Sequence, residues 1–83
     1  DPEHAAAHRE LGLVYGFTGE FDESIAELEK AVALDPEDLK GRNDLALTYS
    51  MLGMYDEAKA EFTRVLEKDP ENAVALRNIV FFQ

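Results

Sequence analysis

The sequence predicts an all-α fold in which pairs of short helices stack on one another. Asp1-Pro2-Glu3 recurs at residue 35 and again at residue 69, which sets a period of 34 residues. Residues 1–34 aligned on 35–68 are identical at eleven positions, and a fixed period in this range is typical of stacked repeats. No segment alternates apolar and polar residues with period two, so no strand is expected.

Each full unit is expected to form two helices. In the first helix, Leu11, Val14 and Tyr15 fall at helical spacing and form its expected apolar face. Gly19 is expected to end that helix, because glycine adopts the left-handed conformation without steric cost. Asp22 is expected to cap the second helix, whose apolar face is formed by Ile25, Leu28, Ala31 and Val32.

The second unit repeats this pattern, and a third unit begins. Gly53 is the counterpart of Gly19, and the third unit contains a first helix only, from Asn72 to Gln83. Proline is expected at the first position of the helix after each Asp-Pro junction. The prediction is one domain of five helices, each of about 11–15 residues, with units 1–34 and 35–68 and a partial unit 69–83.

Composition excludes several classes of function. The 83 residues include no cysteine, so disulfides and thiolate metal sites are excluded. Acidic residues number 18 against 8 basic ones, a net charge of −10 that should repel nucleic acid and anionic membranes. The apolar stretches are too short for membrane insertion. We therefore expect neither a nucleic-acid partner nor insertion into a bilayer.

No catalytic, metal or cofactor site is predicted. His4 and His8 are four residues apart and could chelate a divalent ion, but the glutamate that a zinc protease needs after the first histidine is missing. Glu27 and Glu61 each have a basic residue three positions on, so they are expected to form ion pairs on the helix surface. We expect a non-enzymatic chain without a cofactor.

The two full units resemble the tetratricopeptide repeat, whose pattern is W-x₂-L-G-x₂-Y, then A-x₃-F, then P. Both lack the tryptophan. The matching positions are His8, Leu11, Gly12, Tyr15, Ser24, Leu28 and Pro36 in the first unit, and Arg42, Leu45, Ala46, Tyr49, Ala58, Phe62 and Pro70 in the second. The resemblance implies an α-solenoid with a right-handed superhelical stack of two full helix-turn-helix units and a final single helix.

The resemblance also implies a binding face, because in this family the first helices of the units line a concave groove. The residues expected there are Arg9, Leu13, Phe17, Lys40, Asn43, Leu47, Met51, Arg77 and Phe81. An apolar floor with basic and amide groups suits a peptide or partner protein, amphipathic and with acidic residues. The expected function is a non-catalytic protein-interaction module.

One branch of the family grips the C-terminal carboxylate of chaperone peptides with lysine, asparagine and arginine side chains. The positions that match this clamp hold Arg9, Leu13, Asp44, Val74 and Asn78 here. Of these only Arg9 is similar, and Asp44 would repel a carboxylate. We therefore do not expect that mode of binding.

The apolar C-terminal end supports an alternative function. Val80, Phe81 and Phe82 follow one another in the last helix, and an exposed apolar face marks an interaction surface. They are expected either to meet a continuation of the array or to mediate self-assembly of a homo-oligomeric scaffold. The plainer interpretation is that the last helix buries them against the second unit. A docking segment of a larger enzyme is a third interpretation.

Overall fold

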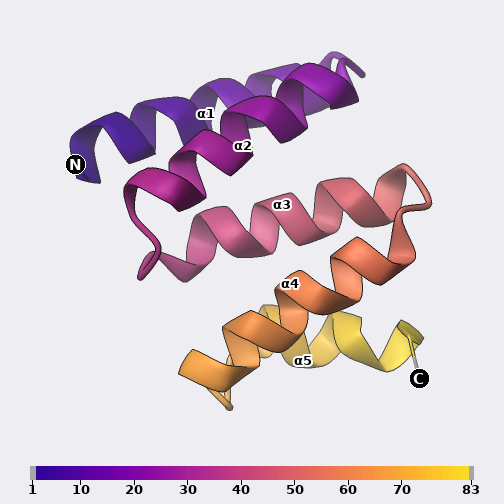
Figure 1. Cartoon of the computed structure of the whole chain (residues 1–83). Helices are drawn as coiled ribbons and strands as arrows, with labels where there is room; N and C mark the ends of the chain where they lie inside the picture. Colours follow the sequence, from indigo (N-terminus) through magenta and orange to yellow (C-terminus); the bar gives the residue numbers. More distant parts are fainter. Residues whose placement is uncertain (1, 83) are drawn as a thin grey trace.

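The computed structural model describes residues 2–82, and five α-helices contain most of them (Figure 1). The elements are α1 (Pro2–Phe17), α2 (Phe21–Leu34), α3 (Leu39–Met51), α4 (Tyr55–Lys68) and α5 (Ala73–Ile79), with a 3₁₀ turn, η1 (Val80–Phe82), after α5. No residue from 2 to 82 lies in a strand. The all-α prediction is confirmed. Within this range, no helix has both the length and the apolar character that crossing a bilayer requires.

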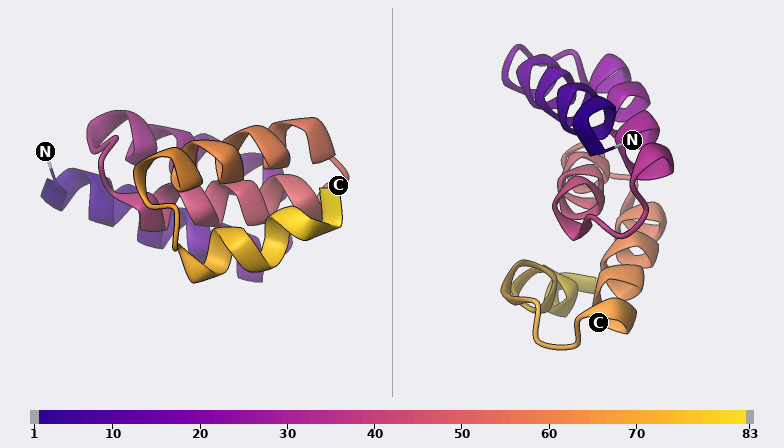
Figure 2. Two further views of the ribbon diagram at one scale, coloured as in Figure 1. Left: turned by 90° about the horizontal axis from the view of Figure 1, so that it is seen from below. Right: turned by 90° about the vertical axis from the view of Figure 1, so that its left-hand side faces the viewer.

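The helices stack in chain order into a curved solenoid. The right-hand view of Figure 2 shows α1, α3 and α5 along one side of the stack, with α2 and α4 along the other. Each helix packs mainly on the helices before and after it, and α1 also touches α3. The first helices of the units therefore share one face, on which the binding residues were predicted.

Glycine ends the first helix of each full unit, as the sequence predicted. Gly19 has φ of 80° and Gly53 has φ of 77°, and no other residue in the described chain has a positive φ. This left-handed conformation turns the chain so that the next amide reaches back to the helix. Glu20 N–H donates to the Tyr15 carbonyl at 2.9 Å, and Met54 N–H donates to the Tyr49 carbonyl at 2.9 Å.

The predicted helix starts are wrong in two respects. Pro2 opens α1 as predicted, but Pro36 and Pro70 do not open α3 and α5, which each begin three residues after the proline. At α3 the helix begins after Asp38, whose side chain accepts a hydrogen bond from Lys40 N–H at 3.1 Å. An aspartate N-cap satisfies a free amide, so it defines the start better than proline does. Asp22 is not a cap but lies in the first turn of α2, where its charge favours the helix N-terminus.

The last helix is shorter than predicted. It begins at Ala73 and gives way to the 3₁₀ turn at Val80, and the expected end at Gln83 lies outside the described residues. Asn72 caps it by accepting a hydrogen bond from Ala75 N–H at 3.1 Å. The cap explains why the helix starts at this point of the third unit.

Two groups of buried side chains hold the stack together. Leu28 of α2 packs with Leu45 and Tyr49 of α3, and Ile25 and Val32 pack on this group. Further along the stack, the side chains between α3, α4 and α5 form the second group, Ala46, Phe62, Val65 and Ala75. Both groups lie between successive helices, so packing between neighbours supplies the stability.

Leu11 and Val14 are not core residues, contrary to the prediction. Leu11 is 42% exposed, whereas Leu45, its counterpart 34 residues later, is 4% exposed. The difference has a plain cause: α2 covers Leu45, and no described element covers that side of α1. The repeat pattern assigned Leu11 and Leu45 to the same helix face, but it did not reveal that a preceding helix covers this face only at Leu45.

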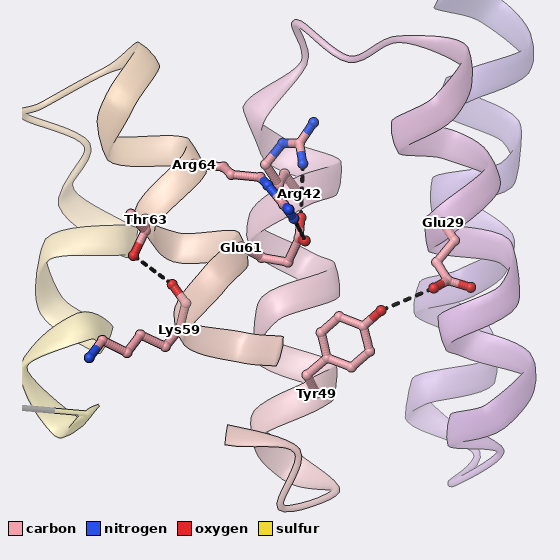
Figure 3. A network of polar contacts seen from close by, with 7 residues as sticks. All are labelled: Glu29, Arg42, Tyr49, Lys59, Glu61, Thr63 and Arg64. Carbon is pink, nitrogen blue, oxygen red and sulfur yellow. Dashed lines mark hydrogen bonds and ion pairs between the residues drawn. The ribbon is translucent and has the colours of Figure 1, made fainter. Parts of the chain in front are cut away.

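Glu27 and Glu61 do more than form surface pairs within a helix, so that prediction needs correction. Glu61 accepts from Arg42 of α3 at 2.9 Å and from Arg64 of α4 (Figure 3). Glu27 likewise lies 2.7 Å from the His8 ring nitrogen and 3.2 Å from Lys30. Each glutamate thus ties together the two helices of its unit. The hydrogen bonds from His8 and then Lys30 hold the pKa of the Glu27 carboxyl below its usual value.

A tyrosine links the two units. The Tyr49 hydroxyl of α3 donates to Glu29 of α2 at 3.0 Å (Figure 3). Burial, and then this bond to a carboxylate, raise the pKa of Tyr49 to about 12. The hydroxyl therefore stays protonated and able to donate at neutral pH.

Candidate functional site

The predicted binding residues lie on the first helices of the units. Arg9, Leu13 and Phe17 are on α1, Lys40, Leu47 and Met51 are on α3 with Asn43, and Arg77 and Phe81 are on α5 and η1. These are the elements along one side of the stack in Figure 2. The structure divides them between two neighbouring hollows and a set of side chains that face elsewhere.

The first hollow lies between α1 and α3 and has a volume of about 510 Å³. Its surface is mostly apolar, and it brings together four of the predicted residues, Leu13, Phe17, Leu47 and Met51. The full lining is Gly12, Leu13, Gly16, Phe17, Ser24, Asp44, Leu47, Thr48, Ser50 and Met51. We call this hollow the α1–α3 groove. Its volume is within the range of about 300–1,000 Å³ that ligand pockets usually have.

The edges of the α1–α3 groove carry large apolar side chains in water. Phe17 is 92% exposed, and Met51 is also exposed. Leu13 and Leu47 are partly buried, and Leu47 also packs on the second group of core residues. Exposed aromatic and methionine side chains beside an apolar hollow are typical of a surface that packs against a partner.

Three of the four polar side chains that line the α1–α3 groove, Ser24, Thr48 and Asp44, already have partners. The buried Ser24 hydroxyl donates to the Gly12 carbonyl at 2.7 Å. Thr48 donates to the backbone carbonyl of Asp44 at 2.9 Å, and the Asp44 carboxylate accepts from Arg9 Nε at 2.6 Å. The groove therefore combines an apolar surface with polar side chains of which all but Ser50 are bonded within residues 2–82 of the protein.

Two predicted contacts are corrected by these bonds. Arg9 was expected to offer a positive charge to the ligand, but Asp44 neutralises it. Asn43 was expected to line the groove, but it is only 7% exposed and its amide donates to Asn72 at 3.2 Å. Because Asn72 caps α5, Asn43 joins α3 to the start of the next unit.

Lys40 and Arg77 remain as cations of the predicted set. Both are exposed, and neither takes part in an ion pair within residues 2–82. Lys40 lies in the first turn of α3, and Arg77 lies in the last turn of α5. They are available to acidic groups of a ligand.

The second hollow lies beyond α3 and has a volume of about 650 Å³. It is more polar than the α1–α3 groove and shares Ser50 with it. Its lining consists of Ser50, Tyr55, Asp56, Lys59, Asn78, Phe81 and Phe82. Of this lining, only Phe81 was among the residues predicted for the binding face, and Phe82 was predicted for self-association. The residues of α4 were not predicted, because only the first helices of the units were expected to line the groove. The available signal was Lys59, a charged residue at the position of Ile25 in the first unit.

The three residues predicted for self-association are not equivalent. Val80 is 59% exposed and Phe81 is 79% exposed. Phe82 is partly buried, with its ring centroid 5.9 Å from that of Tyr55 and 6.2 Å from that of Phe62. Phe82 thus packs on α4, which corrects its predicted role, while Val80 and Phe81 face solvent.

Comparison with known proteins identifies the family. A family model described as tetratricopeptide repeat matches residues 18–80. The chain belongs to the tetratricopeptide repeat family. Domains of this family are typically non-catalytic interaction modules. No curated protein matches the chain.

Solved tetratricopeptide repeat structures share the fold. One is the first TPR domain of Spaghetti (RPAP3), solved with the HSP90 peptide SRMEEVD. It superposes with a TM-score of 0.62 and 22% sequence identity, over 98% of this chain and 91% of that chain. At this level of identity the likeness establishes the fold, and the site has to be argued from the residues of this chain.

Proposed function

We propose that this chain is a non-catalytic module that binds a peptide or a segment of a partner protein across α1, α3 and α5. The observation that carries the proposal is the apolar α1–α3 groove with Phe17 almost fully exposed at its edge. Burying such side chains against a ligand is favourable at about 25 cal/mol per Å² of apolar surface. Family membership supports the same function.

The proposed ligand is amphipathic and carries acidic residues. Its apolar side chains pack in the α1–α3 groove, and its acidic residues lie near Lys40 and Arg77. This differs from a clamp on a terminal carboxylate. Asp44 occupies a clamp position, so a free carboxylate there would meet a negative charge, and the charge of Arg9 is already paired with Asp44.

The test compares two variants that each add two negative charges. In Phe17→Glu/Met51→Glu both changes are at exposed edges of the groove, so folding is retained. Ala26→Glu/Ala60→Glu is the matched control, because these exposed alanines lie on α2 and α4. The probe is a set of peptides selected from a random library on the unaltered chain.

We expect the groove variant to weaken peptide binding at least about tenfold, a change of about 1.4 kcal/mol, and the control to bind normally. Equal binding by the unaltered chain and the groove variant would refute the assigned face. Circular dichroism checks that both variants keep their helices. Leu47 is left unchanged because it also packs in the core.

Self-assembly is the alternative function, favoured by one observation. Leu76, Val80 and Phe81 are exposed together on α5 and η1. In this proposal the surface packs against a second copy of the chain. Sedimentation over a wide range of concentration tests it. Val80→Asp/Phe81→Asp should convert an oligomer to monomer, and an unaltered chain that stays monomeric throughout would contradict the proposal.

A further inference from the structure

Gly16 of α1 has no evident structural reason to be glycine. Its φ is not in the left-handed region. A Cβ built on it would meet only the Ser24 hydroxyl, at 3.5 Å, which is an ordinary contact. Gly12, one turn earlier, is different: a Cβ there would lie 2.8 Å from Leu28 Cγ and 3.2 Å from the Ser24 carbonyl. Close packing of α1 on α2 thus requires Gly12 but not Gly16.

The absent side chain at position 16 opens the α1–α3 groove. Gly16 lines this groove next to Leu13 and Phe17, and Ser24 of α2 lies beneath it. Glycine within a helix lowers stability relative to alanine, so this position keeps an open space at a cost to the helix. The space is apolar and large enough for bulky side chains of a ligand.

The chemistry of the lining selects what can enter. Ser24 and Thr48 use their hydroxyl protons on backbone carbonyls, and Asp44 is paired with Arg9. A charged side chain that entered would lose water and find no unpaired group of opposite charge, which is unfavourable. An uncharged apolar side chain gives up no hydrogen bond to water when it enters, and burying its surface is favourable.

The neighbouring hollow differs at the equivalent positions. The position that matches Gly16 in the next unit is occupied by Ser50. In the same way, Lys59 matches Ile25 and Asn78 matches Asp44. Lys59 lines that hollow, and Arg77 lies on α5 nearby in the chain. Asp56 also lines the second hollow. Relative to the α1–α3 groove, the matching positions of the second hollow thus lose the negative charge of Asp44 and gain the positive charge of Lys59.

We propose that the α1–α3 groove at Gly16 is an anchor subsite for bulky, uncharged, apolar side chains such as leucine, methionine or phenylalanine. The acidic residues of the same ligand extend from the anchor toward α5. This inference rests on the proposed function and specifies its ligand. It requires no terminal carboxylate, so an internal segment of a partner protein can bind.

The probes are short helical host peptides, acetylated and amidated so that neither end is charged. Two anchor positions one helical turn apart carry leucine, methionine or phenylalanine in one series and aspartate or lysine in the other. Two glutamates follow the anchors in every peptide. Fluorescence anisotropy measures their binding to the unaltered chain and to three variants: Gly16→Ala, Gly16→Leu and Ala60→Leu.

We expect the apolar series to bind at least about tenfold more tightly than the charged series. Gly16→Leu fills the groove and removes that preference, whereas Ala60→Leu on α4 leaves it unchanged. Gly16→Ala raises the melting temperature, because alanine is the better helix former, and still weakens binding. Higher stability combined with weaker binding separates loss of the site from damage to the fold.

Tight binding of the apolar series by Gly16→Leu, or equal binding of both series by the unaltered chain, overturns the anchor. If Phe17→Glu/Met51→Glu abolishes binding of the library peptides while Gly16→Leu does not, the groove stands and the anchor is wrong. If neither variant changes binding, the proposed function is wrong as well. Library peptides that bind in the groove without an apolar residue also overturn the anchor.

Discussion

Leu11 and Leu45 are the same residue at the same position of two repeats, so truncating each to alanine measures the effect of the missing neighbour. Complete burial of a leucine side chain is worth about 1.5–3 kcal/mol. Leu45 is 4% exposed between α2 and α3, so Leu45→Ala loses nearly all of this and leaves a cavity. The expected cost is about 2.5–4 kcal/mol.

Leu11→Ala should be much milder. Leu11 is 42% exposed, so its burial contributes little more than half of the transfer free energy of a fully buried leucine. In Leu11→Ala, water fills the space of the removed side chain, so no cavity forms. The expected cost is about 1 kcal/mol. The difference between the two variants is therefore about 2 kcal/mol, or roughly 8–16 °C in melting temperature for a domain of this size.

Urea titration at low temperature, followed by circular dichroism, provides the free energies of unfolding. The concentration is kept where sedimentation shows a monomer, so that no second copy covers α1. An equal loss of stability in the two variants would falsify the argument, because it would mean that the Leu11 face is covered within the monomer. A ratio near the expected one supports stability from interfaces between neighbours.

Three further predictions follow from the structure. Gly12→Ala should lower the free energy of unfolding by about 1–3 kcal/mol, because the new methyl group displaces the buried Leu28. Thermal unfolding measures this loss, and a more stable variant would contradict the close contact between Gly12 and Leu28. Glu27 has a lowered pKa in the folded state, so its stabilising effect is present above its ordinary pKa of 4.5 and is lost as the pH falls further. Glu27→Gln should therefore lose less stability than the unaltered chain between neutral pH and pH of about 3, and equal losses would argue against the bonded carboxylate. Tyr49, with its pKa raised to about 12, contributes stability that is present below pH 10.0 and lost above it. Tyr49→Phe should cost about 0.5–1.5 kcal/mol at neutral pH and remove this alkaline loss. Because the chain has three tyrosines, the readout is the tyrosinate absorbance that Tyr49→Phe removes, and its appearance near the ordinary pKa of 10.0 would refute the bond to Glu29.

The fold could be predicted because its causes are local. The 34-residue period, the glycines after the first helices and the spacing of apolar residues each act within one helix pair. The helix starts were less accessible, because they depend on whether Asp38 or Asn72 turns its side chain back to the chain. Proline permits a helix start but does not determine it.

The apolar lining of the α1–α3 groove was predicted from the repeat register, and the ion pairing of its charged residues was not. Leu13, Leu47 and Met51 line one groove as expected. Arg9 was counted as a ligand contact, although its partner Asp44 is 35 residues away and belongs to the other unit. Ion pairs across units depend on how the units are rotated, which the residues of one helix do not reveal. The same reason applies to Asn43 and Asn72.

The position of α1 at one end of the stack has a consequence for its motion. Its packing is mainly with α2, and it touches α3 only slightly, so α1 can open while the rest of the stack stays folded. One wall of the groove belongs to α1, whose contact with α3 across the groove is small. A ligand that bridges α1 and α3 supplies the contact that α1 lacks, and its binding energy then resists local opening. Amide hydrogen exchange should accordingly slow along the whole of α1, well beyond the residues in contact with the ligand. The exchange rate of α1 then reports whether a ligand is bound in the groove.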